Sequence, residues 1–132
     1  MDDMESHILA LEQEQVEAYN KVDIDSIVSH YDQEIVGFSS TKHDRFHGLA
    51  ELSRTFDYYL QKTSKLEYSI SDPTLQIFGD TAILSFYWLT VMVFGKTRRE
   101  VQGRGTHVYR LVDGQWKIVH EHFSRAHHAY EK

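Results

Sequence analysis

Residues 103–124 read GRGTHVYRLVDGQWKIVHEHFS and contain two runs of β-branched and aromatic residues on either side of Asp113-Gly114. This dipeptide adopts positive φ angles readily and is typical of the tight turn of a β-hairpin. We therefore predict a long antiparallel hairpin in which Val112 pairs with Gln115. Because side chains alternate between the faces of a strand, this register defines the residues that share one face. They are Gly105, His107, Tyr109, Leu111, Trp116, Ile118, His120 and His122.

This face of the hairpin is apolar near the turn and rich in histidine further from it. In the predicted register His107 lies opposite His120, and His122 follows on the same side. The other face is mixed, with Arg110 opposite Lys117 among its pairs. We therefore expect a cavity over the histidine-rich face, and the candidate catalytic residues are His107, His120 and His122.

The composition fits one globular domain, residues 1–132, with 41% hydrophobic and 26% charged residues. The chain has no cysteine, which excludes disulfide bonds and cysteine-based zinc or thiol chemistry. It shows neither a secretory signal nor a membrane-spanning apolar run, so we predict a cytoplasmic protein without a membrane partner. A net charge of −6 argues against a nucleic-acid partner, because nucleic-acid binding requires a basic surface.

The first half of the chain is predicted to be mostly helical, because apolar residues recur there with helical spacing. We expect helices at residues 2–22, 24–31 and 49–61, a strand at residues 34–40, and a loop or very short strand at residues 41–47. Gln15 falls on the apolar stripe of the first helix and is expected to face inward. There it either bonds to the backbone or serves as a donor that lines a pocket.

From residue 66 onward the pattern changes to the two-residue period of β-strands. Pro73 interrupts the first of these strands, which fits an edge position or a bulge. Residues 81–94 are apolar on both faces of the strand, so neither face is expected to meet water. The residues of the outer face are Ile83, Tyr87, Leu89, Val91 and Val93. We predict a homodimer or larger homo-oligomer that covers them, and coverage by the C-terminal tail is the alternative.

Helices followed by long antiparallel strands predict an α+β fold, in which N-terminal helices pack on a strongly curved antiparallel sheet. Gly103 and Gly105 are expected to face Trp88 and Phe86 on the neighbouring strand, which indicates a bend with room above it. A pocket is expected between this sheet and the helices. Its predicted lining is Gln15, Tyr19, Trp88, Arg104, Tyr109 and Trp116.

Several motifs lie at the junctions of the predicted elements: VDIDSI at residues 22–27, FHG at residues 46–48 and FGDTA at residues 78–82. THV at residues 106–108 and DGQWKIVHEH at residues 113–122 form the final strand pair. Together these motifs resemble the nuclear transport factor 2-like superfamily and its SnoaL-like members. The final pair is similar to the association domain of calcium/calmodulin-dependent protein kinase II. The resemblance implies a cystatin-like cone with a pocket, over nearly the whole chain.

The resemblance does not define an activity, because the fold hosts isomerases, dehydratases, cyclases, hydrolases and assembly modules. Ketosteroid isomerases use a tyrosine, an aspartate base and a protonated aspartic acid at positions that correspond here to Gln15, Ser39 and His107. None of the three matches, so a steroid-type isomerase is not expected. The kinase association domain has an arginine at the position of His107.

Three roles for the histidines remain open from the sequence. His-x-His with a third histidine on a neighbouring strand can bind a metal, histidines that face a cavity can transfer protons, and histidines can be structural. We assign no metal ligand and no cofactor. Our main hypothesis is a pocket for an unidentified small molecule, with lyase, isomerase or hydrolase chemistry. The alternative is a non-catalytic oligomerisation or interaction module, so whether the protein is an enzyme stays open.

Overall fold

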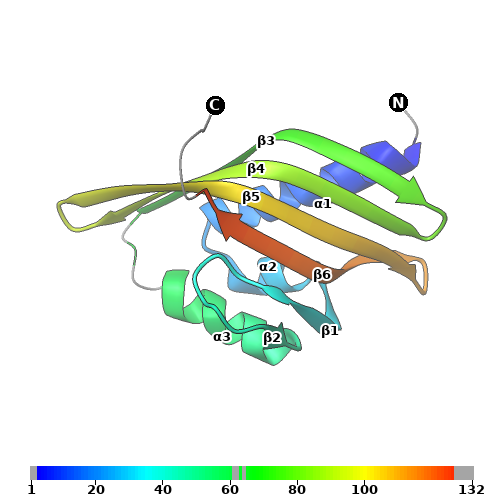
Figure 1. The fold of residues 1–132 in the computed structure, drawn as a ribbon, viewed down its shortest axis with the longest axis horizontal. Helices are drawn as coiled ribbons and strands as arrows, with labels where there is room; N and C mark the ends of the chain where they lie inside the picture. Colours follow the sequence, from blue (N-terminus) through cyan, green and yellow to red (C-terminus); the bar gives the residue numbers. More distant parts are fainter. Residues whose placement is uncertain (1–2, 61–62, 64, 127–132) are drawn as a thin grey trace.

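The computed structural model describes residues 3–60, 63 and 65–126, in which three helices pack on one face of a curved sheet (Figure 1). The helices are α1 (Asp3–Asn20), α2 (Ile24–Val28) and α3 (Leu49–Leu60). The strands are β1 (Tyr31–Phe38), β2 (Phe46–His47), β3 (Lys65–Phe78), β4 (Thr81–Phe94), β5 (Thr97–Val112) and β6 (Gln115–Arg125). They form one sheet in the order β2-β1-β6-β5-β4-β3. The predicted α+β class is confirmed.

The sheet is mixed, because β1 runs parallel to β6 whereas the other described pairs are antiparallel. A tight turn forces the two strands that it joins to run antiparallel, but no tight turn joins β1 to β6, so these two strands can run parallel. β1 also begins earlier than predicted, at Tyr31, whose register partner is Ile118. The backbone N–H of Ile118 donates to the carbonyl of His30 over 2.9 Å. The partner strand lies far along the chain, and the local pattern therefore did not show this start.

Side-chain hydrogen bonds cap the start of α2 and attach the end of α1 to the sheet. The side chain of Asp23 accepts a hydrogen bond of 3.2 Å from the backbone N–H of Ser26 and so caps α2, which ends at Val28 rather than at residue 31. At the end of α1, the Asn20 amide donates to the carbonyl of Tyr68 over 2.8 Å and accepts from its N–H over 2.7 Å. These two bonds tie α1 to the edge strand β3.

Pro73 lies in β3, the edge strand of the sheet, as predicted. The register between β3 and β4 shifts between Ser71 and Thr74, and Asp72 has a φ of 51°. Proline lacks a backbone donor, so an irregular edge position accommodates it at little cost.

The two glycines of β5 allow close packing rather than an open space. Gly103 pairs with Trp88 and Gly105 with Phe86, as predicted. A Cβ atom on Gly103 would lie 1.9 Å from the carbonyl oxygen of Ser124, and one on Gly105 would lie 2.8 Å from the ring of Phe86. Neighbouring groups therefore fill the space directly at these glycines, although a cavity does lie against the ring of Trp88.

A β-bulge changes the register of the β5–β6 hairpin. Near the turn the pairs are those predicted, from Val112 with Gln115 to Tyr109 with Ile118. Between Val108 and Tyr109 the register then shifts, so that His107 pairs with Glu121 instead of His120. An extra residue in one strand sends all later side chains of that strand to the opposite face. The predicted pairing of His107 with His120 was therefore wrong.

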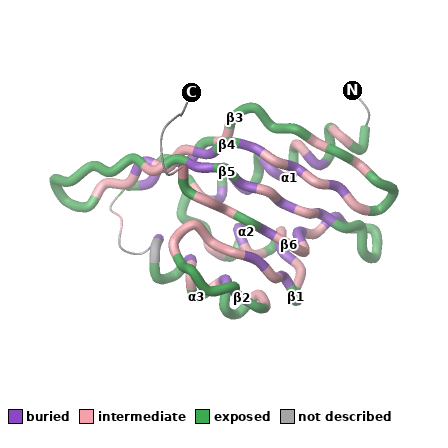
Figure 2. The backbone as a smooth tube through the Cα atoms, in the orientation of Figure 1, coloured by how far each residue is buried: buried purple, intermediate pink, exposed green. Residues whose placement is uncertain are grey.

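Buried residues gather in the central parts of β4, β5 and β6, whereas the hairpin ends are exposed (Figure 2). On the outer face of β4, Tyr87 is 54% exposed and Val91 is buried outside the main core cluster. Residues 127–132 of the C-terminal tail, the alternative cover for this face, lie outside the described residues.

Candidate functional site

A cluster of polar side chains lies buried between α1 and the sheet. Glu12 and Gln15 come from α1, His107 from β5 and Glu121 from β6, and each is at most 3% exposed. Glu12 and Gln15 are three residues apart and therefore share one face of α1. The bulge of the hairpin turns Glu121 toward the same interior. Helix and bulge together thus bring two carboxylates to one imidazole.

His107 lies between the two carboxylates. Its Nδ1 donates to Oε1 of Glu12 and its Nε2 donates to Oε1 of Glu121, each over 2.7 Å. Burial by itself lowers the pKa of His107, but the charges and hydrogen bonds of Glu12 and Glu121 outweigh burial and raise the pKa to about 10. His107 is therefore an imidazolium near neutral pH, with both ring nitrogens acting as donors.

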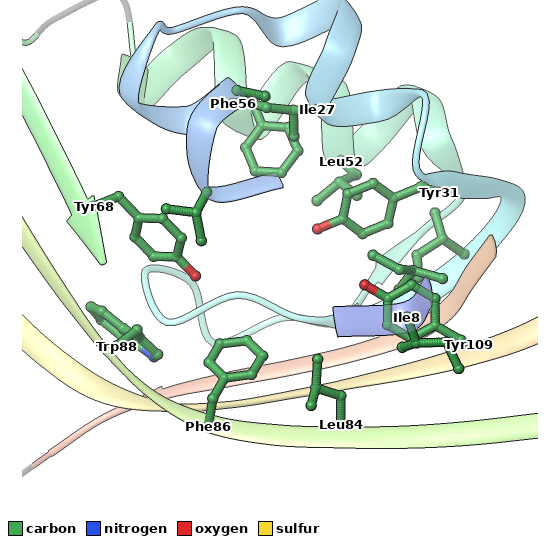
Figure 3. Close-up of a cluster of buried hydrophobic side chains, with 14 of the residues drawn as sticks. Ile8, Ile27, Tyr31, Leu52, Phe56, Tyr68, Leu84, Phe86, Trp88 and Tyr109 are labelled. Carbon is green, nitrogen blue, oxygen red and sulfur yellow. The ribbon is translucent and has the colours of Figure 1, made fainter. Parts of the chain in front are cut away.

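Tyrosine hydroxyls complete the network. Tyr109 donates to Oε1 of Glu12 over 2.8 Å, and Tyr31 donates to Oε1 of Glu121. Figure 3 shows Tyr31, Tyr68 and Tyr109 with their hydroxyl groups directed into the interior between helices and sheet. Burial raises the pKa of all three, and of Tyr19, so these hydroxyls remain protonated and can donate.

A cavity of about 200 Å³ adjoins this network, and Glu121 is part of its wall. Both hydrogen bonds to Glu121 are accepted by Oε1, and no donor among the described residues bonds to Oε2. The lining is mostly apolar and aromatic. It consists of Tyr19, Ser39, Ser40, Thr41, Leu52, Thr55, Phe56, Leu60, Leu66, Tyr68, Trp88, Thr90, Met92, Phe94, Arg99, Val101, Glu121, Phe123 and Arg125. The cavity wall thus combines the buried carboxylate of Glu121 with apolar and aromatic side chains, several hydroxyl groups and two exposed arginines.

The model of the SnoaL-like domain family matches residues 8–128. The chain belongs to the SnoaL-like family. No curated protein matches it significantly in sequence.

Solved structures similar to this SnoaL-like chain span nearly all of it. An NTF2-like protein of unknown function from Pseudomonas putida is 26% identical, with a TM-score of 0.82 over 96% of this chain and 89% of the other. The S. rosetta CaMKII hub is 26% identical, with a TM-score of 0.78 over 90% of this chain and 94% of the other. A protein of unknown function with a cystatin-like fold from Nostoc punctiforme is 16% identical, with a TM-score of 0.77 over 96% and 95%.

The structure of this SnoaL-like protein separates the three candidate histidines. His107 is buried in the network, whereas His120 and His122 lie on the outer face of the sheet, beyond the bulge. His122 is exposed and packs against Phe38, with ring centroids 5.1 Å apart. The predicted cluster of three histidines is therefore not formed, because the bulge reverses the faces of His120 and His122. Among the described residues, no group of three or more His, Asp or Glu side chains has an arrangement that could hold a metal ion.

The predicted pocket residues fall into three groups. Tyr19 and Trp88 line the cavity. Gln15, Tyr109 and Trp116 are buried but do not line it. Arg104 is exposed and pairs with Tyr87 and Ser124 on the outer face, away from the cavity.

Gln15 faces inward as predicted, yet both polar atoms of its amide lack a hydrogen-bond partner among the described residues. The same holds for Oε2 of Glu12 and Nε1 of Trp88. Buried polar atoms of this kind are normally satisfied, often by ordered water. We therefore expect water molecules or ligand atoms beside these groups.

Sequence reasoning missed both carboxylates of the SnoaL-like site. Glu12 had a usable signal, since it lies four residues after buried Ile8 on the inward stripe of α1. An acidic residue on a buried stripe requires a partner. Glu121 had no such signal, because its inward orientation depends on the bulge.

None of the described helices is long and apolar enough to cross a membrane.

Proposed function

We propose that the protein binds a small molecule in its cavity and exchanges a proton with it through Glu121. The observation that carries this proposal is the asymmetry of the Glu121 carboxylate. Oε1 accepts from His107 and Tyr31, while Oε2 bonds to no described residue and belongs to a residue of the cavity wall. A carboxylate fixed at one oxygen and available at the other suits a general acid or base.

In this proposal His107 is a positioning residue rather than the proton-transfer group. Its imidazolium donates to Oε1 of Glu121 and so holds the carboxylate in place, and His107 itself does not line the cavity. Isomerisation, elimination and hydrolysis all include a proton transfer, so the proposal covers the lyase, isomerase and hydrolase classes. Glu121 is 3% exposed, and electrostatic interactions of so buried a group with a bound molecule are stronger than in bulk water.

Replacing Glu121 with glutamine is expected to abolish proton exchange in the cavity. The probe is a small aromatic ketone such as phenylacetone, whose α-hydrogens a carboxylate base can remove. Exchange of these hydrogens in D₂O is followed by proton NMR, with and without protein. A positioned base contributes roughly 100-fold or more, so the protein-dependent rate in Glu121→Gln should fall by about that factor.

The matched control is Glu67→Gln, because Glu67 is exposed on β3 and ion-paired to Lys65 over 3.3 Å. This variant should exchange at the wild-type rate. If the protein-dependent exchange rates of wild type and Glu121→Gln were equal, Glu121 would not be the group that transfers the proton.

A second candidate function is assembly, and the outer face of the sheet favours it. This face presents Tyr87, which is 54% exposed, beside partly buried Ile83 and Leu89. A similar structure, at 26% identity, is the S. rosetta CaMKII hub. An exposed aromatic side chain beside apolar neighbours on a sheet is typical of a surface that a second subunit covers. We propose a homo-oligomer that buries this face.

Replacing Tyr87 with glutamate is expected to weaken this assembly at least about tenfold, because it places a charge in an apolar interface. Sedimentation velocity at micromolar concentrations measures the change. Tyr58→Glu is the control, since Tyr58 is similarly exposed but lies on α3, remote from the outer face. A wild-type protein that sediments as a monomer would refute the assembly proposal.

A further inference from the structure

The buried network pairs two carboxyl groups with a single imidazole. With both carboxylates ionised, Glu12 and Glu121 contribute −2 and the His107 imidazolium contributes +1, a sum of −1. Among the described residues, His107 is the one cation that pairs with either carboxylate. The tyrosine hydroxyls that surround them are neutral donors. A buried net charge is unfavourable unless another group balances it.

A ligand in the cavity can meet this negative charge at Oε2 of Glu121. Glu121 is 3% exposed and lines the cavity, and its Oε2 accepts no hydrogen bond from a described residue. Arg99 and Arg125 also line the cavity, but both are exposed and neither pairs with Glu121. The cavity therefore has a negative buried end and a positive exposed end.

Aromatic rings surround the buried end. Tyr19, Tyr68, Trp88 and Phe123 all line the cavity, and Trp88 stacks on Phe123 with ring centroids 6.0 Å apart. The faces of such rings attract cations, most strongly where water is excluded. The ring of His107 itself lies 5.4 Å from the rings of Phe86 and Phe123.

We propose that the cavity selects small monovalent organic cations, in which a primary or secondary ammonium group donates to Oε2 of Glu121 and an apolar body contacts the aromatic wall. The inference rests on the proposed function, because it requires a ligand in the cavity. It further specifies that this ligand carries one positive charge. A volume of about 200 Å³ suits a ligand whose buried part is small. The arginines at the exposed end disfavour a second positive charge, so diamines should bind less well than monoamines.

Three probes with nearly the same shape test the charge preference: 2-phenylethylamine, 2-phenylethanol and 3-phenylpropionate. Their dissociation constants are measured by ligand-observed NMR near neutral pH. A charge-assisted hydrogen bond is worth about twice a neutral one, so the amine should bind roughly tenfold more tightly than the alcohol. The carboxylate should bind most weakly, because it meets Glu121.

Glu121→Gln should remove the advantage of the amine and leave the affinity for the alcohol unchanged, whereas Glu67→Gln should preserve the advantage. The comparison of the three probes on the wild-type protein stands even if Glu121→Gln fails to fold. If the alcohol or the carboxylate binds as tightly as the amine, the cavity binds ligands but the cation preference is wrong. If none of the three binds, both the cation preference and the proposed binding function are overturned.

Discussion

Replacing His107 with leucine is expected to lower the free energy of unfolding by about 3–5 kcal/mol, the usual result of removing one partner from a buried ion pair. The side chain of His107 is 1% exposed, and both of its ring nitrogens donate to carboxylates. Without the imidazolium, Glu12 and Glu121 would remain buried with like charges. Urea-induced unfolding near neutral pH measures the loss.

Two further variants separate charge from packing. His122→Leu changes an exposed histidine on the outer face and should alter stability by no more than about 0.5 kcal/mol. Adding Glu12→Gln and Glu121→Gln to His107→Leu removes the buried charges and should restore part of the stability. If the triple variant is no more stable than His107→Leu, the loss comes from packing and not from unpaired charge.

The stability of the wild-type protein is expected to decrease with rising pH on the alkaline side of neutrality. The pKa of His107 is raised from 6.5 to about 10 in the folded protein, so folding strengthens proton binding. The resulting stabilisation is complete below pH 6.5 and is lost as the pH rises through about 10. Within this range the slope should approach about 1.4 kcal/mol per pH unit.

Urea unfolding at closely spaced pH values, for wild type and His107→Leu, tests this dependence. The variant should lack the decrease between pH 6.5 and 10, so the two curves should converge as the pH rises. Burial of the tyrosines also raises their pKa and lowers stability at high pH, but it acts in both proteins. Parallel curves would show that His107 does not hold an extra proton in the folded state.

The predictions that were confirmed rest on local signals. Asp113-Gly114 fixed the position of the turn, and the pairs next to it follow from the alternation of side chains. Gly79 and Gly95 have positive φ angles at the turns on either side of β4, and the β4–β5 register follows from them. In each case the pairing partners are joined by a short turn, so neighbouring residues determine the register.

The predictions that failed involve contacts between residues distant in the chain. A bulge in β6, opposite Val108 and Tyr109 of β5, moved His120 and His122 to the outer face and turned Glu121 inward. β1 joins β6 in parallel, which a local pattern does not specify. The residues that the bulge turns inward make long-range contacts there: Glu121 accepts from Tyr31 of β1 and from His107, which also bonds to Glu12 of α1. Neither the contact with Tyr31 nor that with Glu12 is visible within the hairpin sequence.

By itself the sequence determined the α+β class, the central hairpin, the edge position of Pro73 and the inward orientation of Gln15, because hydrophobic period and turn residues act over a few positions. The tertiary structure alone decided the chemistry of the site. It joined a glutamate of α1, a histidine of β5 and a glutamate of β6 into one buried network. A single extra residue in β6 reverses every side chain beyond it, so the identity of the group at the cavity depends on packing across the whole fold.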